Sequence, residues 1–158
     1  MITAMKEELD SAGLSNVAIT GSTEENFPTC MTALSVTVIG VGEKLKFEPA
    51  KEEDVLVLIG SPKFGAEVDV ESPGFYTEIS RLLSMPQVKE IVPVGSKGIE
   101  YEAVTLASLS NMEVSFANTG IDYKKSAGPA TCVLVLCNDK SICEYGVVVG
   151  YIKPPQNI

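Results

Sequence analysis

Residues 88–109 read VKEIVPVGSKGIEYEAVTLASL, and this stretch decides how the rest of the chain is interpreted. Its first part, Val88–Val94, is dense in β-branched residues, which predicts a buried strand. Two glycines then interrupt the apolar run. The apolar residues that follow share one helical face: Ile99, Ala103, Leu106 and Leu109. The pattern therefore predicts a strand, a glycine loop and a helix.

The glycine loop is the first candidate binding site, and it consists of Gly95, Ser96, Lys97 and Gly98. A loop ahead of a helix leaves backbone N–H groups unpaired at the positive end of the helix dipole, where an anion can bind. Lys97 adds a full positive charge. The alternative is a plain turn that needs glycines for its dihedral angles.

Elements on both sides of this stretch follow from hydrophobic patterns. An amphipathic pattern predicts a helix at residues 2–13, ending near Gly13. The continuous apolar run 55–59 predicts a central strand covered on both faces. A second helix starts at Ser72-Pro73, buries Phe75, Ile79 and Leu82, and stops at Pro86. Further strands are predicted at 17–20, 31–41, 113–116, 130–137 and 147–152.

Strands and helices interleave without a strict alternation, which predicts an α+β fold with a mixed sheet. The charged segment 43–54 contains Pro49 and is the one plausible internal boundary. We therefore expect two parts, residues 1–47 and residues 48–158.

Composition limits the function. The chain has 158 residues, a net charge of −9 and 45% apolar residues. The acidic balance argues against nucleic acid and anionic membrane surfaces as partners. No apolar run approaches the ~20 residues that span a bilayer, and the N-terminus lacks a signal-peptide layout. We expect a soluble cytoplasmic protein.

The chain has no histidine, which excludes Ser-His and Cys-His nucleophile pairs and histidine-based zinc sites. Its four cysteines form no C-x-x-C pair, so a redox motif or zinc knuckle is not expected. Cys132 and Cys137 lie in or beside an apolar strand, where cysteine acts as a small buried hydrophobe.

Three more loops carry candidate groups. The loop 61–65 places Lys63 between Pro62 and Gly65, or is a plain turn that contains a lysine. Residues 124–129 hold the clearest basic spot, with Lys124, Lys125, Ser126 and Gly128. If this loop meets the Gly95–Gly98 loop, three lysines and two glycine turns surround one anion site. The adjacent acids Glu24 and Glu25 could hold Mg²⁺, or they lie on a solvated hairpin.

The order of these pieces resembles the aminoimidazole ribonucleotide synthetase (AIR synthase, PurM-like) superfamily. The resemblance rests on VLVLIGSPKFGAEV, EIVPVGSKGIEYEAVTLA, KKSAGPATCVLVL and VVVGYI, which are similar to the family's C-terminal domain. VAITGSTEENFPTCMTALSVTVIG resembles the end of its first domain. Val94–Gly98 stands where the family has D-x-S-x-G-G, without the acid.

The resemblance implies a PurM C-terminal-domain-like fold at 48–158, preceded by a remnant of the N-terminal domain at 1–47. It implies ATP and Mg²⁺ as cofactors. We also expect a homodimer or higher oligomer, because the predicted strand at 31–41 would otherwise leave unpaired edges. The resemblance also implies that a partner chain could carry the earlier N-terminal portion.

Three functional hypotheses remain. The first is an AIR synthase-related protein that binds a phosphorylated small molecule or nucleotide. The second is an ATP- and Mg²⁺-dependent kinase or ligase, completed by oligomerisation or by a partner chain. The third is a non-catalytic structural or regulatory dimer.

Overall fold

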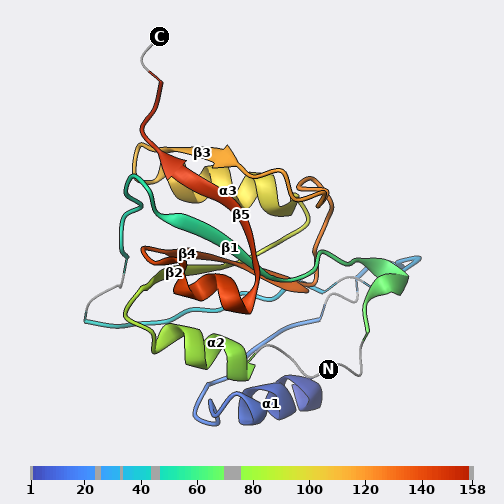
Figure 1. Ribbon diagram of the computed structural model, residues 1–158. Coiled ribbons are helices and arrows are strands. Elements are labelled where there is room, and N and C mark those ends of the chain that lie inside the picture. Colours follow the sequence, from blue (N-terminus) through green and yellow to red (C-terminus); the bar gives the residue numbers. More distant parts are fainter. Residues whose placement is uncertain (1, 24–25, 33, 44–46, 70–75, 157–158) are drawn as a thin grey trace. The chain divides into compact units, whose positions relative to one another are not determined.

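The computed structural model describes residues 2–23, 26–32, 34–43, 47–69 and 76–156 (Figure 1). It divides the chain into two compact units, residues 1–45 (unit 1) and residues 46–158 (unit 2).

Unit 1 begins with α1, Ile2–Ser11. Gly13 ends this helix in the left-handed conformation, with φ +71°, and the N–H of Leu14 donates to the carbonyl of Leu9 at 2.8 Å. A glycine tolerates this conformation because it has no Cβ. The predicted helix and its end at Gly13 are therefore confirmed.

The predicted strands at 17–20 and 31–41 are wrong for the residues that the structure describes there. These residues are in no strand. The alternation of apolar and polar residues at 34–41 favours an extended chain, but a strand also needs a hydrogen-bonded neighbour. Their side chains are strongly exposed, with Val38 at 87% and Val41 at 99%.

Unit 2 is built on one five-stranded sheet with the order β2-β4-β1-β5-β3. All four strand pairs are antiparallel. The strands are β1 (Val55–Gly60), β2 (Val88–Pro93), β3 (Glu113–Phe116), β4 (Cys132–Cys137) and β5 (Val147–Lys153).

The α+β class is confirmed, and the predicted mixed sheet is wrong. β1, β2 and β3 run in the same direction, as strands joined through helices usually do, but β4 lies between β1 and β2, and β5 lies between β1 and β3. Each neighbour therefore runs the opposite way. The parallel strands are present but never adjacent.

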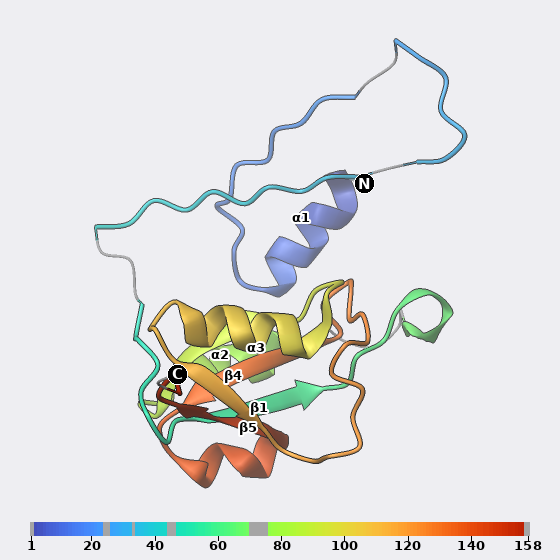
Figure 2. The same cartoon turned by 90° about the horizontal axis from the view of Figure 1, so that it is seen from above.

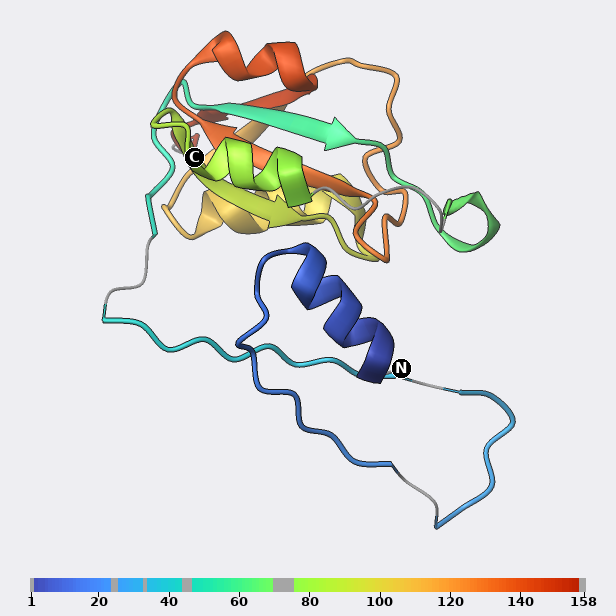
Figure 3. The same cartoon turned by 90° about the horizontal axis from the view of Figure 1, so that it is seen from below.

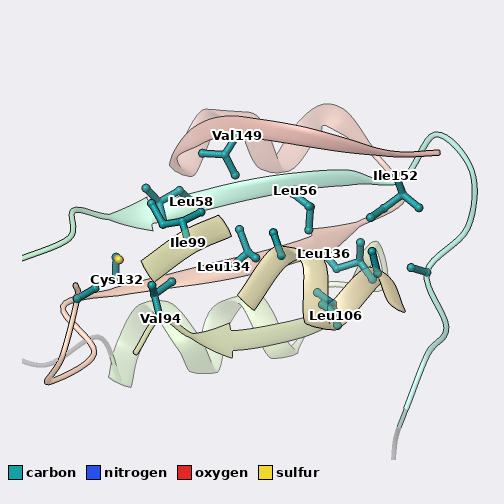
Figure 4. Close-up of a cluster of buried hydrophobic side chains, with 14 residues drawn as sticks. Leu56, Leu58, Val94, Ile99, Leu106, Cys132, Leu134, Leu136, Val149 and Ile152 are labelled. Carbon is teal, nitrogen blue, oxygen red and sulfur yellow. The ribbon is translucent and has the colours of Figure 1, made fainter. Parts of the chain in front are cut away.

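Both faces of the sheet are covered. On one face, α3 (Gly98–Ser108) packs Ile99 and Leu106 into a cluster with Leu56, Leu134 and Leu136 (Figure 4). On the other face, α2 (Tyr76–Leu83) and the 3₁₀ helix η2 (Lys140–Tyr145) cover a second cluster. The central β1 is buried over Val55–Ile59, which confirms the prediction for that strand.

The helix predictions are largely confirmed. Ile79 and Leu82 of α2 pack into the second cluster, and the helix ends before Pro86. The predicted start at Ser72-Pro73 and the burial of Phe75 lie outside the described residues. Leu109 is exposed rather than buried, because α3 ends at Ser108 and Ala107 takes the core position.

Candidate functional site

The loops that carry the candidate residues lie at one end of the sheet. β1, β2 and β3 run in the same direction, so the segments that follow them leave the sheet at the same end. These segments are 61–69, 94–97 and 117–131. Figure 2 shows the loop after β1 and the loop before β4 beside the start of α3. The topology therefore gathers three loops that are distant in the sequence.

The Gly95–Gly98 loop and the 123–127 segment lie backbone against backbone. The N–H of Ala127 donates to the carbonyl of Gly95 at 3.1 Å, and the N–H of Glu100 donates to the carbonyl of Tyr123 at 2.9 Å. Gly98 has φ +81°, and a Cβ there would lie 2.7 Å from the Tyr123 carbonyl oxygen. Gly98 is thus required both by its dihedral angle and by this close approach.

Some of the backbone N–H groups that the sequence predicts to bind an anion instead donate to carbonyl groups of the chain. The N–H of Gly98 donates to the carbonyl of Gly95 at 3.2 Å, and the N–H of Glu100 is engaged by Tyr123. The hydroxyl of Ser126 accepts the N–H of Gly128 at 3.4 Å. Gly128 packs near Ser96, because a Cβ on Gly128 would lie 3.9 Å from the Ser96 nitrogen. The main role of Gly98 and Gly128 is therefore to let the two loops pack closely against each other.

The lysines point in two directions. Lys97 Nζ lies 4.1 Å from the ring centroid of Tyr101, and Lys124 Nζ lies 3.7 Å from Glu100 Oε2. Both therefore lie over α3. Lys125 turns the other way, and its Nζ lies 2.7 Å from Glu67 Oε2 on the 3₁₀ helix η1 (Gly65–Glu67).

A shallow groove runs along the start of α3, with a volume of about 500 Å³. We call it the α3 groove. It is lined by Lys97, Glu100, Tyr101, Val104, Thr105 and Lys124. Of the predicted binding residues, Lys97 and Lys124 line this groove. Gly95, Ser96, Gly98, Lys125, Ser126 and Gly128 lie in the two loops but are not among its lining residues.

The sequence reasoning missed several residues around these loops. The sequence does contain a signal for Tyr101. It lies four positions after Lys97, and residues four positions apart on a helix lie on the same face. Glu67 and Thr131 carried no local signal. Thr131 Oγ1 accepts the N–H of Lys63 and donates to the carbonyl of Ser61, both at 2.9 Å.

A groove of similar volume, about 500 Å³, lies at the opposite end of the sheet, where β1 begins and β4 and β5 end. It is lined by Glu52, Glu53, Val55, Asn138, Lys140, Tyr151, Ile152 and Lys153. Lys140 Nζ lies 5.5 Å from the ring centroid of Tyr151. This second lysine–tyrosine pair provides a matched control for the pair on α3.

The predicted metal ligands Glu24 and Glu25 lie outside the described residues. Within the part of the chain that the structure describes, no three carboxylate or cysteine side chains gather as a metal site would require. Burial raises the pKa of Cys132 and the pKa of Cys137 to about 11. These two thiols are therefore protonated at neutral pH and are poor nucleophiles.

None of the described helices has the length and apolar character needed to cross a membrane. Comparison with models of known protein families, with curated proteins and with solved structures found no match for this chain.

Proposed function

We propose that the α3 groove binds a phosphorylated small molecule or a nucleotide. The observation that carries this proposal is that Lys97, which lies over the ring of Tyr101, and Lys124 line the same groove. Lysine binds phosphate as a point charge. Tyr101 is 45% exposed, so the part of its ring that Lys97 does not cover offers an apolar surface to a base or a sugar.

The carboxylate of Glu100 competes with a ligand for Lys124, but only weakly. The side chain of Lys124 is 79% exposed, and the two charged atoms are 3.7 Å apart. An exposed pair of this kind contributes about 0–1 kcal/mol. A phosphate group carries about −1.5 to −2 charges at neutral pH. It can therefore replace Glu100 as the partner of Lys124.

Calorimetric titration of the full chain with ATP, ADP and ribose 5-phosphate, each with and without Mg²⁺, tests the proposal. We expect saturable binding, and we expect Lys97→Ala and Lys124→Ala each to weaken it by about tenfold, because a charged hydrogen bond is lost. Lys140→Ala, at the opposite groove, is the matched control and should leave the affinity unchanged. No heat at millimolar ligand, or equal losses in all three variants, would contradict the proposal.

The resemblance to the AIR synthase superfamily supports ATP with Mg²⁺ as the first ligand to titrate. The kinase or ligase alternative further requires turnover. ATP hydrolysis measured in the same samples distinguishes binding alone from catalysis.

A second candidate function is self-association through residues 34–41. The chain from Asn26 to Gly42 contains no charged residue, although the whole chain carries −9. Exposed strand edges are normally protected by charges. An extended apolar segment that belongs to no sheet can instead pair with the same segment of a second copy. This feature supports the dimer hypothesis.

Sedimentation velocity tests self-association. We expect a dimer or higher oligomer at about 10–100 μM, a concentration range in which weak protein complexes form, and a monomer for Val38→Lys. A lysine in the segment places like charges opposite each other on pairing. Val17→Lys, an exposed site in the same unit, is the control. A monomeric wild type, or an oligomer that survives Val38→Lys, would exclude this role for the segment.

A further inference from the structure

The segment after β1, residues 61–67, projects beyond the end of the sheet as a strap (Figure 3). Two glycines here have a left-handed backbone: Gly60, with φ +86°, directly precedes the strap, and Gly65, with φ +57°, lies within it. None of its residues belongs to either buried apolar cluster of the described structure. Phe64 is 50% exposed at its tip. Within the strap Pro62 is buried, and polar contacts hold the remaining residues.

The base and the tip of the strap are attached in different ways. At the base, Thr131 Oγ1 bonds the backbone of Ser61 and Lys63. At the tip, Glu67 Oε2 lies 2.7 Å from Lys125 Nζ, and Lys125 Nζ also lies 5.8 Å from the Phe64 ring centroid. The base is fixed by hydrogen bonds to the backbone, whereas both described contacts between the tip and another element are made by Lys125.

The ion pair also decides where Lys125 points. Lys125 follows Lys124 directly, yet the two side chains reach different elements, η1 and α3. The hydrogen bond from Lys125, together with the charge of Lys125 and a hydrogen bond from the Phe64 backbone, holds the pKa of Glu67 below its usual value. The Glu67 carboxylate is thus charged at neutral pH. It pairs with the ammonium group of Lys125, which could otherwise bind an anionic ligand.

We propose that Glu67 is an internal competitor for anions: its pair with Lys125 fastens the strap, and release of the strap supplies Lys125 as a further lysine beside Lys97 and Lys124. This inference deepens the proposed function and rests on it. The carboxylate stands in for a ligand oxygen. Because the side chains of Lys125 and Glu67 remain 30% and 50% exposed, a ligand can reach the pair and displace the carboxylate. The strap then opens when an anion arrives.

Hydrogen exchange of the full chain tests the fastening without any ligand. We expect Glu67→Gln to raise exchange of the backbone amides in 63–68 by about two- to fivefold, the range that corresponds to loss of a partly exposed ion pair. Glu113→Gln is the matched control, because Glu113 pairs with Lys153 at 3.2 Å at the opposite end of the sheet. Unchanged exchange in Glu67→Gln would overturn the fastening and the inference with it.

Titration with ATP and with inorganic pyrophosphate tests the competition. We expect Glu67→Gln to bind both anions about two- to fivefold more tightly than the wild type. The gain should disappear in Glu67→Gln/Lys125→Met. If the wild type binds but Glu67→Gln binds no more tightly, the competition is wrong and the proposed function stands. If neither protein binds, both the proposed function and the competition are wrong.

Discussion

Replacing Gly98 with alanine is expected to destabilise unit 2 by about 2–5 kcal/mol, because two costs add. The first is the left-handed backbone, with φ +81°. The second is the space for a methyl group, which would lie 2.7 Å from the carbonyl oxygen of Tyr123 and 2.9 Å from that of Lys125. Both obstacles are backbone atoms and cannot rotate away. Urea denaturation followed by circular dichroism measures the loss.

Gly120→Ala separates the two costs of the Gly98 substitution. Gly120 also has a left-handed backbone, with φ +75°, but a Cβ there meets nothing within 4 Å. We expect this variant to lose only about 1–2 kcal/mol. Equal losses in the two variants would mean that the 123–125 backbone does not press on Gly98. The contact between the two candidate loops would then be looser than described.

Lys89→Met is expected to destabilise the protein by about 3–5 kcal/mol, since it leaves a buried carboxylate without its cation. Asp54 and Lys89 are 4% and 6% exposed. Lys89 Nζ lies 2.6 Å from Asp54 Oδ2, and the same oxygen accepts the N–H of Lys51 at 2.7 Å. The bond to Lys51 alone cannot compensate a buried negative charge. Thermal and urea unfolding measure the change.

Two further variants test this account of the buried pair. Asp54→Asn/Lys89→Met removes both charges and should recover much of the loss, because the desolvated charge is gone. Lys153→Met removes the cation of an exposed pair with Glu113 and should cost less than about 1 kcal/mol. A Lys89→Met variant that is as stable as Lys153→Met would contradict the assignment.

Local patterns were informative wherever a structural decision depends on neighbouring residues. The end of α1 at Gly13, the complete burial of Val55–Ile59 and the strand–loop–helix unit at 88–108 all follow from such patterns. Helix faces and strand burial depend on side chains a few positions apart, and the amino-acid sequence states these directly. The strand predicted at 31–41 is wrong for its described residues, because an alternating pattern does not by itself provide a hydrogen-bonded neighbour.

The candidate site shows the same division. Glycine and lysine content predicts its loops. It does not predict which residues elsewhere in the chain contact them. Glu67 reaches Lys125 from a distant part of the chain, and Tyr123 uses its carbonyl to engage the start of α3. A lysine in a loop looks the same whether it faces solvent, a ligand or an acid of its own chain.

By itself, the sequence determined the burial of Val55–Ile59, the strand–loop–helix unit at 88–108, and that the chain is acidic and lacks histidine. Only the tertiary structure decided that β4 and β5 separate the parallel strands, that three loops meet at one end of the sheet, and that Lys124 and Lys125 diverge. The physical reason is the separation along the chain of the residues that interact. Strand pairing and ion pairs join residues that are far apart in the chain, and their choice depends on the packing of the whole sheet rather than on any local pattern.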